Sequence, residues 1–578
     1  MSIDINFMAG GEAGQGVQTV GFILSKAFAR GGYHVFADQD YESRVRGGHN
    51  FFRVRVKDSW VGAIAEPVDM LLALNQESIE LHQQKLTDGG VIIFDGEKIK
   101  GIPGKTALFS VPLDRLAEET AGNKLMANST AVGAALGLVG YDFEVCSPIL
   151  KEHFGGGEVG ESNVKAARAG YDYARQNFKG DFGHRLNPIS DSQRMLLTGN
   201  EAIALGAIAA GCKFMAAYPM TPASSIMEYM AAQARDFNLV VVPAEDEIAA
   251  VNMIIGAGYA GVRAMTATSG GGFCLMVEGL GLAGMTETPI VVVDAQRPGP
   301  AIGLPTRTEQ SDLQFVLHAS HGEFPRVVLA PATVEDCFWL TIKAFNLAEK
   351  FQLPVILLTD QHLASSYATV EPFDLSGVTI DRGLLFSTEE GSSPANYQRH
   401  RITASGISPR AFPGQEGALV VTDSDEHNEE GHLIEDAETR TLMMQKRLRK
   451  LFSLKKEISV PRIYGAKKAD MMLIGWGSTY GAIWEAVDIL NKEGTKANSL
   501  HLNELWPFPA QAVAEAMSHT PISYIIENNA TGQLAYLIRA ETGTEVNGKI
   551  LKYDGRPFTA EYIAQQVRKE SGKHEHSD

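Results

Sequence analysis

Short apolar segments alternate with longer segments of helical periodicity along most of the chain. In the first third, the apolar segments at 4–10, 33–41, 69–75 and 90–96 predict strands, and residues 17–32 show the spacing of an amphipathic helix. Short strands that alternate with helices are typical of a parallel, doubly wound sheet. The pattern therefore predicts an α/β fold for this part of the chain.

The same alternation returns twice after a polar boundary segment at 177–194. Strands of the second block are predicted at 238–244, 263–269, 289–296, 326–332 and 354–360. An irregular segment rich in Gly, Ser and Pro follows at 361–426, and a charged amphipathic helix is predicted at 435–457. A third strand–helix block completes the chain. We predict three doubly wound α/β domains, with the boundaries 1–180, 192–455 (including the connecting helix) and 456–578.

Composition narrows the class of protein. The 578 residues are too many for one hydrophobic core. A formal net charge of −18 disfavours binding to nucleic acid and to anionic membranes. No apolar run is long enough for a membrane helix, and the N-terminal sequence MSIDINFMAGG lacks the basic start of a signal peptide. We expect a cytoplasmic enzyme.

The four cysteines, Cys146, Cys212, Cys274 and Cys337, lie far apart and form no CxxC pair. This spacing excludes a local iron–sulfur or zinc motif and fits a reducing cytoplasm. We predict that the cysteines are buried small residues. His427 and His432, in the hydrophilic segment DSDEHNEEGH, match no metal-ligand spacing and are predicted to lie in a surface loop. No metal site is expected in this chain, so a partner would supply any redox centre.

Two glycine-rich turns could contact a ligand. The turn GEAGQG, 11–16, follows the first strand, where backbone N–H groups can bind a phosphate, but it lacks the GxGxxG spacing and also fits a simple tight turn. Arg44 and Arg46 stand beside two further glycines and could meet an anion or remain solvated. The second turn, TSGGG at 268–272, precedes an apolar helix.

Glu247 begins a predicted helix whose body is almost wholly small and apolar. An acidic residue at a helix start is favoured by the helix dipole alone. However, a carboxylate that enters an apolar region is costly without a proton or a donor partner. Gly256 and Gly258 in the same helix suggest that another backbone approaches closely. Both a structural and a catalytic role remain open on pattern alone.

Arg297, Thr306 and Arg307 lie in a Pro/Gly-rich loop that follows the predicted strand 289–296. Ligands bind at the carboxyl ends of parallel strands, and an arginine there is suited to bind a carboxylate in a bidentate manner. The structural alternative is an ion pair between Arg297 and Glu309 or Asp312.

The turn YPMTPASS, 218–225, stands between a predicted strand and a helix. Pro219 and Pro222 restrict the backbone, so the turn can present the hydroxyl of Thr221 at the strand end. Ser224 and Ser225 are suitable residues to cap the following helix.

Taken in order, GEAGQGVQTVG, ESRVRGG, AAYPMTPASS, GLPTRTEQSDL, EHNEEGH and ENNATGQ resemble one family over essentially the whole chain. It is the fused gamma–alpha subunit of 2-oxoacid:ferredoxin oxidoreductases, most similar to the 2-oxoglutarate enzymes. The family hallmark reads YPITPSS, and Met220 and Ala223 depart from it mildly. The resemblance implies a gamma domain, a pyrimidine-binding domain for thiamine diphosphate and a transketolase C-terminal-like domain.

The resemblance also implies that thiamine diphosphate is shared with a beta subunit. That partner would carry Mg²⁺, the diphosphate site and a [4Fe–4S] cluster, in an (αβ)₂ assembly that reduces ferredoxin. Coenzyme A would be the acyl acceptor, with Arg44 and Arg46 as candidate contacts. The absence of a cysteine cluster from this sequence agrees with that division.

Residue by residue, Glu247 matches the family's catalytic glutamate, which hydrogen-bonds N1′ of the aminopyrimidine. Tyr218 and Pro219 match cofactor-binding positions. The positions that match substrate-binding residues are Thr221, Arg297, Thr306 and Arg307.

The resemblance favours coenzyme A-dependent decarboxylation of 2-oxoglutarate to succinyl-CoA and CO₂, or the reverse carboxylation. Pyruvate and branched-chain 2-oxoacids remain alternatives, because their enzymes share the motifs. A carboligase should carry its own diphosphate motif, which we do not find here. A non-catalytic regulatory subunit would have no need to keep Thr221, Glu247 and Arg297 together.

Overall fold

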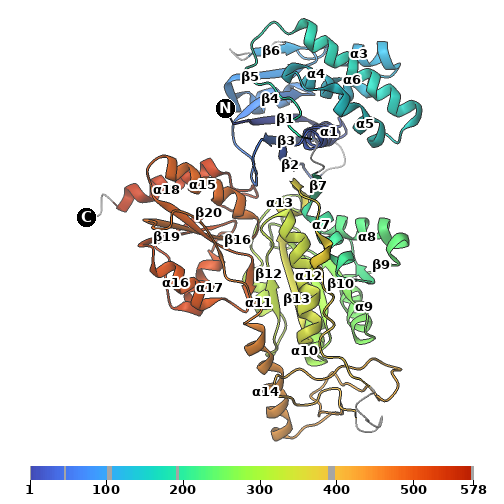
Figure 1. The fold of residues 1–578 in the computed structure, drawn as a ribbon, viewed down its shortest axis with the longest axis vertical. Helices are drawn as coiled ribbons and strands as arrows, with labels where there is room; N and C mark the ends of the chain where they lie inside the picture. Colours follow the sequence, from blue (N-terminus) through green and yellow to red (C-terminus); the bar gives the residue numbers. More distant parts are fainter. Residues whose placement is uncertain (1, 44–46, 101–106, 191–193, 388–396, 575–578) are drawn as a thin grey trace. The chain divides into compact units, whose positions relative to one another are not determined.

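The computed structural model describes all of the chain except residues 1, 44–46, 101–106, 191–193, 388–396 and 575–578. Its contacts divide it into two compact units, coloured along the chain in Figure 1. Unit 1 holds 1–198, 365–373 and 559–561, and unit 2 holds the rest. The α/β fold class is confirmed by the sheets and helices of both units. The three-domain division stays a prediction.

Unit 1 is built on an eight-stranded sheet in the order β6-β5-β4-β1-β3-β2-β14-β7. The strands are β1 (Asp4–Glu12), β2 (His34–Asp40), β3 (His49–Lys57), β4 (Val68–Ala73), β5 (Leu86–Phe94), β6 (Ala107–Ser110), β7 (Met195–Thr198) and β14 (Tyr367–Val370). The neighbouring strands β6, β5, β4 and β1 run parallel to one another. In the rest of the sheet, from β1 through β3, β2 and β14 to β7, each neighbouring pair is antiparallel. The sheet is therefore mixed rather than wholly parallel as the sequence pattern predicted.

Helices cover both faces of this sheet. The helices are α1 (Val17–Arg30), α2 (Gln76–His82), α3 (Leu113–Ala121), α4 (Ala127–Val139), α5 (Phe143–His153) and α6 (Gly157–Asn177). The main core lies between the sheet and α1, α4 and α5, and a smaller core lies under α2. Glycines let α4 and α6 pack backbone to backbone, because a Cβ on Gly133 would lie 1.8 Å from the carbonyl oxygen of Ala167.

Unit 2 contains a seven-stranded sheet in the order β18-β12-β13-β11-β10-β8-β9. Its strands are β8 (Phe214–Ala217), β9 (Val240–Pro243), β10 (Ala264–Thr268), β11 (Ile290–Gln296), β12 (Val327–Leu329), β13 (Pro354–Asp360) and β18 (Glu504–Trp506). All run parallel except the edge strand β18. Every residue of β11 and β13 is buried, which explains why both read as continuous apolar runs.

Most of the helices that accompany this sheet connect its parallel strands. They are α7 (Gly199–Ala209), α8 (Ser224–Phe237), α9 (Glu247–Tyr259), α10 (Gly270–Met285), α11 (Leu313–His318), α12 (Val334–Phe351) and α13 (Gln361–Ser365). Side chains from α9, α10 and α11 form one core with β10, β11 and β13. Because parallel strands end at the same edge, the loops after β8, β10 and β11 meet there.

The C-terminal part of unit 2 forms a five-stranded sheet, β15-β17-β16-β19-β20. Its strands are β15 (Arg462–Gly465), β16 (Met471–Trp476), β17 (Ala497–Leu502), β19 (Ile522–Glu527) and β20 (Gly548–Leu551), and its helices are α15 (Tyr480–Lys492), α16 (Ala510–Ser518), α17 (Gln533–Thr542) and α18 (Ala560–His574). Figure 1 shows α15 and α18 on one side of the sheet and α16 and α17 on the other. In this part of the structure, β18 pairs with β12 and so joins the two sheets of unit 2.

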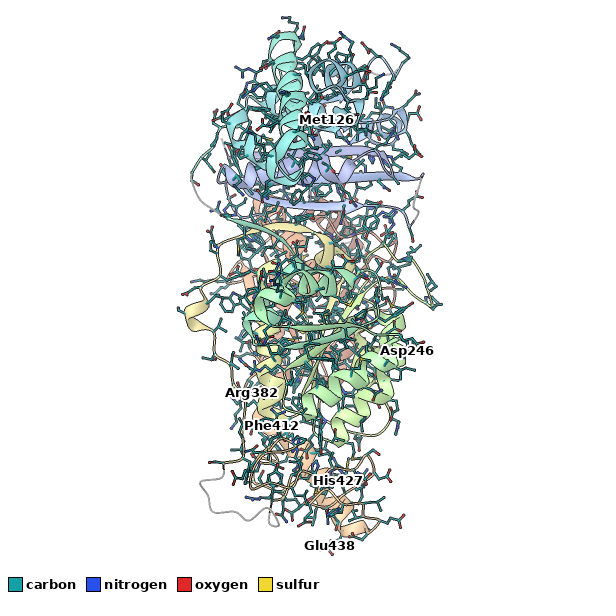
Figure 2. The ribbon with its side chains drawn as sticks, turned by 90° about the vertical axis from the view of Figure 1, so that its right-hand side faces the viewer. Met126, Asp246, Arg382, Phe412, His427 and Glu438 are labelled. Atoms are coloured by element: carbon teal, nitrogen blue, oxygen red, sulfur yellow. The ribbon has the colours of Figure 1, made fainter. Side chains whose placement is uncertain are left out.

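Segment 361–426, predicted to be irregular, contains α13, β14 and the short helix Leu375–Gly377, and is otherwise irregular where described. Helix α14 (Ala437–Leu454) follows, within the predicted 435–457. Two buried ion clusters hold this region to the sheet. Glu349 pairs with Arg263, Arg382 and Arg410, and Figure 2 labels Arg382 near Phe412, whose ring it contacts.

The second cluster surrounds Glu287, which is fully buried and pairs with Lys446 and Lys450 of α14 and with His400. The ring of His427 lies beside that of His400, tilted by 50° with ring centroids 4.0 Å apart, and His427 is also fully buried. The prediction that His427 lies in a surface loop is therefore wrong. Its polar neighbours in sequence concealed a side chain that points into the ion cluster.

The cysteine prediction holds for Cys146, Cys212 and Cys337, which are buried, but not for Cys274, which is exposed on α10. Cys274 occupies an apolar helix, but on the side that this unit leaves uncovered. Within the described ranges, no helix has the length and apolar character needed to cross a membrane.

Candidate active site

Glu247 is the first residue of α9, and its side chain is 4% exposed. The neighbouring Asp246, labelled in Figure 2, caps the helix by accepting a 2.7 Å hydrogen bond from the backbone N–H of Ala249. The helix-capping role therefore belongs to Asp246, which leaves Glu247 unexplained by capping. Among the residues that the structure describes, its Oε1 is buried without a hydrogen-bond partner. An unpaired buried carboxyl oxygen is costly, which indicates a ligand.

The glycine turn at the start of α10 has no room for a side chain on the side of this carboxyl group. A Cβ on Gly272 would lie 2.1 Å from Thr268 Oγ1 and 2.4 Å from Glu247 Oε1. The predicted close approach at Gly258 is confirmed, because a Cβ there would lie 2.6 Å from the carbonyl oxygen of Pro289. At Gly256 the prediction is wrong, since nothing described lies within 4 Å. The TSGGG turn thus forms part of the surroundings of the Glu247 carboxyl group.

Arg297 and Thr221 are brought together from loops 76 residues apart. Arg297 Nη1 donates a 2.7 Å hydrogen bond to the backbone oxygen of Thr221. This contact replaces the ion pair with Glu309 or Asp312 that the sequence left open. Partial burial lowers the pKa of the Arg297 guanidinium. The arrangement ties the loop after β11 to the turn after β8.

The turn at 218–222 is anchored from behind by Asn200 of α7. Its Nδ2 donates 2.7 Å to the backbone oxygen of Pro222 and 2.8 Å to Ser225 Oγ. Helix α8 begins after Ala223, and the structure records no side-chain cap. The predicted capping role of Ser224 and Ser225 is therefore wrong. Asn200 was missed because nothing local links it to a turn 22 residues later.

Thr306 is buried, and Arg307 packs its side chain against the loop at Gly555, where a Cβ would lie 3.0 Å from Arg307 Cβ. The same loop is fixed to the C-terminal part by Gln310, whose N–H donates 2.7 Å to the backbone oxygen of Asn528. Gln310 Nε2 also donates 2.9 Å to the oxygen of Trp476. The C-terminal part of unit 2 thus positions the part of the loop that carries Thr306 and Arg307.

Tyr218 and Pro219 follow β8 directly and are exposed. Exposed apolar side chains also occur on α9 and α10, where Ile248 is 50%, Met253 40% and Leu275 50% exposed. Single exposed apolar residues are ordinary, but a group of them beside a buried unpaired carboxyl group suggests a contact surface.

In unit 1, the glycine-rich turn after β1 is tightly packed. Gly16 has φ 77°, and a Cβ there would lie 2.0 Å from Asn128 Nδ2. Gln15 Oε1 also accepts 2.7 Å from the N–H of Glu12. These contacts agree with the alternative that GEAGQG is a simple tight turn. Arg44 and Arg46, the predicted coenzyme A contacts, lie outside the described residues.

Known proteins match the chain along nearly its whole length. The subunit alpha of a 2-oxoacid:ferredoxin oxidoreductase from Sulfolobus sp is 34% identical over 98% of this chain and 96% of that protein. The chain belongs to the 2-oxoacid:ferredoxin oxidoreductase family. It is an enzyme subunit of the alpha type in that family. The 2-oxoglutarate oxidoreductase subunit KorA of Mycobacterium tuberculosis is 30% identical over 96% of this chain and 90% of its own.

A solved structure agrees with this family assignment. The 2-oxoglutarate:ferredoxin oxidoreductase from Magnetococcus marinus, with 2-oxoglutarate, coenzyme A and succinyl-CoA bound, superposes with a TM-score of 0.91. It is 34% identical and covers 98% of this chain and 99% of that one.

Three family models match successive parts of the oxidoreductase subunit. They are pyruvate ferredoxin/flavodoxin oxidoreductase at 6–173, the thiamine diphosphate-binding model of pyruvate flavodoxin/ferredoxin oxidoreductase at 205–446, and core domain II of pyruvate:ferredoxin oxidoreductase at 469–563. Glu247, Thr221 and Arg297 all fall within the thiamine diphosphate-binding match. The unpaired oxygen of Glu247 and the absence of a Cβ at Gly272 fit the placement of a cofactor ring there.

Proposed function

We propose that the chain is the alpha subunit of a 2-oxoglutarate:ferredoxin oxidoreductase. The reaction is coenzyme A-dependent decarboxylation of 2-oxoglutarate to succinyl-CoA and CO₂, with electrons passing to ferredoxin. The observation that carries the proposal is the buried, unpaired Oε1 of Glu247 at the strand edge where Arg297 and Thr221 meet. The names of the Mycobacterium tuberculosis and Magnetococcus marinus relatives favour 2-oxoglutarate over pyruvate and branched-chain 2-oxoacids.

Glu247 would hold the aminopyrimidine ring of thiamine diphosphate through its unpaired oxygen. When bound, that cofactor supplies a thiazolium carbon, C2, that becomes nucleophilic on loss of its proton. The Glu247 carboxyl group would share a hydrogen bond with ring nitrogen N1′ and so favour the tautomer that accepts a proton. Its dry surroundings strengthen such a bond. Tyr218 and Pro219 would flank the same ring.

Arg297 would orient the substrate. One terminal nitrogen of its guanidinium is held by Thr221, and among the described residues this is the hydrogen bond that Arg297 makes. Its remaining N–H groups suit a 2-oxoacid carboxylate, and the Thr221 contact fixes their direction. Thr306 and Arg307 would lie toward the distal end of the substrate, where 2-oxoglutarate has its second carboxylate.

A beta subunit would complete the site. Mg²⁺ and the [4Fe–4S] cluster are assigned to that partner, because the family resemblance implies this division. The exposed face around Ile248, Met253 and Leu275 is the candidate contact surface. We further propose an (αβ)₂ assembly in the cytoplasm, with coenzyme A approaching Arg44 and Arg46, and a reaction that can also run as reductive carboxylation.

The test is co-expression with the neighbouring beta gene and comparison of 2-oxoglutarate with pyruvate as substrates. We expect a brown complex that turns over 2-oxoglutarate. A clear preference for pyruvate would show that the substrate proposal is wrong, and a colourless active homomer would favour a carboligase. A complex inactive with every 2-oxoacid would favour the regulatory alternative.

The role of Glu247 is tested separately with Glu247→Gln. We expect this change to stop exchange of the C2 proton of bound cofactor with solvent while the fold is retained. The matched control is Glu245→Gln, because Glu245 is exposed two residues earlier. Exchange at the wild-type rate in Glu247→Gln would refute the assignment.

A further inference from the structure

The loop 297–312, which carries the predicted substrate-binding residues after β11, is closed at its base. Over these residues the chain forms neither helix nor strand. The N–H of Asp312 donates a 2.9 Å hydrogen bond to Oε1 of Gln296, the last residue of β11. The two ends of the loop are therefore neighbours in space, as in the compact surface loops that often carry binding residues. How this base is held determines where the side chains of the loop can point.

Gln310 ties this base to the C-terminal part of unit 2 with each of its polar groups. Its backbone N–H donates 2.7 Å to the oxygen of Asn528, and its Nε2 donates 2.9 Å to the oxygen of Trp476. In the other direction, its Oε1 accepts 3.1 Å from the N–H of Asn528, and its backbone oxygen accepts 3.0 Å from Nδ2 of Asn529. Gln310 is fully buried, so water cannot replace bonds that its side chain loses.

Gln533 makes a second tie to the same base. Its Nε2 donates 2.6 Å to the backbone oxygen of Ser311, and its Oε1 accepts 2.9 Å from the N–H of Gln314. The side chain of Gln314 donates 3.1 Å back to the backbone oxygen of Gln533. Gln533 is the first residue of α17 and is only partly buried. The segments 310–314 and 528–533 are thus joined by direct hydrogen bonds along their length.

The second of these segments belongs to the motif ENNATGQ, which is held in shape by Glu527. The carboxyl group of Glu527 is fully buried and accepts 3.0 Å from Nε1 of Trp476 and 2.8 Å from the N–H of Leu534. It also accepts 3.0 Å from Nδ2 of Asn529, whose Oδ1 accepts 2.7 Å from the N–H of Gly532. The motif is therefore fixed by its own hydrogen bonds, in addition to those that it makes to the loop base.

The two ends of the loop are not held alike. Arg297 donates to the oxygen of Thr221, a contact that lies outside the C-terminal part of unit 2. At the other end, the hydroxyl of Thr308 donates 3.2 Å to Asp360, which is long for a hydroxyl donor. The residues just before Thr308 therefore depend on the ties at the loop base more than Arg297 does.

We propose that Gln310 and Gln533 are positioning residues that set the preference of the enzyme for a 2-oxoacid with a second carboxylate. They hold the loop base so that Thr306 and Arg307 face the distal end of the substrate, while Arg297 binds its oxoacid end. They act through the loop and do not touch the substrate. Placement matters because a hydrogen bond weakens steeply when its donor is misaligned. This inference deepens the proposed function and rests on it for the roles of Thr306 and Arg307.

The ties are tested first on the full-length chain without cofactor, by amide hydrogen exchange. Gln533→Met keeps the length of the side chain but removes its bonds to Ser311 and Gln314. We expect peptides that cover 304–314 to exchange about 10-fold faster than in the wild-type chain. The control Gln511→Met, at an exposed position of α16, should leave their exchange unchanged. Wild-type exchange of these peptides in Gln533→Met would overturn the proposal.

The specificity role is tested on the complex with 2-oxoglutarate and 2-oxopentanoate, which has the same carbon chain without the second carboxylate. In Gln533→Met and Gln310→Met, the ratio of kcat/KM for 2-oxoglutarate to that for 2-oxopentanoate should fall about 10-fold, mainly through a higher KM for 2-oxoglutarate. Gln511→Met should keep the wild-type ratio. Because Gln310 is the more buried residue, Gln533→Met carries the test if Gln310→Met does not fold.

The outcomes separate this inference from the proposed function. A merely structural role would change both kcat/KM values by the same factor, so an unchanged ratio in Gln533→Met would overturn the inference alone. A wild-type complex that prefers 2-oxopentanoate would refute the proposed substrate and the specificity role together. The exchange result does not depend on the substrate, so the ties themselves would still be judged by it.

Discussion

Gly272 offers a sharp test of the geometry at the candidate active site. In Gly272→Ala, the new methyl carbon would lie 2.1 Å from Thr268 Oγ1 and 2.4 Å from Glu247 Oε1, far inside contact distance. Thr268 is fully buried in β10, so Glu247 is the side chain that must move. Overpacking of this kind costs about 1–3 kcal/mol, partly offset by the better helix propensity of Ala, about 1 kcal/mol. The chain should therefore fold with a small loss of stability.

The effect on the cofactor should be larger than the effect on folding. A hydrogen bond to a charged group contributes about 1.5–3 kcal/mol, which corresponds to roughly 10- to 100-fold in affinity. Displacement of Glu247 should weaken thiamine diphosphate binding to the complex by about that factor. Calorimetric titration of the cofactor measures the affinity, and urea unfolding of the chain measures the stability.

Two glycines with free space serve as controls. Gly256→Ala lies in an exposed helical position with nothing described within 4 Å, so it should stabilise the chain by about 0.5–1 kcal/mol. Gly377→Ala has similar space outside the site and should leave cofactor affinity unchanged. Wild-type affinity in Gly272→Ala would refute the placement of the cofactor against Glu247. A stability loss in Gly256→Ala as large as that in Gly272→Ala would refute the steric argument.

Two further predictions concern charged groups. Arg297→Lys keeps a cation but cannot hold the Thr221 oxygen and a carboxylate in one planar fork. The KM for the 2-oxoacid should therefore rise about 10-fold or more, with unchanged cofactor affinity, and an unaltered KM in steady-state kinetics would contradict the role of Arg297. Burial raises the pKa of Glu287, but Lys446 and Lys450 outweigh burial and hold that pKa well below its usual value. Glu287 therefore contributes stability that is present above about pH 4.5 and lost as the pH falls. Glu287→Gln should cost about 3–5 kcal/mol in urea unfolding at neutral pH and less in acid, and an equal cost at both pH values would contradict this account.

The fold class was predictable because the period and the length of the apolar runs distinguish strands from helices. Strands β11 and β13 are buried on both faces, so each begins with a continuous apolar run that stands out from the helices between them. Strand β14 escaped the prediction because four residues in an irregular segment carry no period of their own. It is a strand only because β2 and β7 pair with it.

At the candidate site, the sequence indicated which residues to examine but not how they meet. Glu247 stood out as a carboxylate at the start of an apolar helix, and its burial bears this out. The hydrogen-bond partner of Arg297 is a backbone oxygen, which every residue has, so the sequence could not identify it.

The two short strands β14 and β7 bear on how such a chain could be divided into separate polypeptides. A cut near residue 180 would remove both from the sheet of unit 1, although β6 to β2 would remain. Strand β2, with Val35, Phe36 and Ala37 buried, would then become an open edge. Open apolar edges pair with other chains, so a polypeptide that ended near residue 180 would need its own covering strand or a redesigned β2. In the fused chain β14 and β7 cover this edge. A split of the chain would have to supply another cover for β2 at the same time.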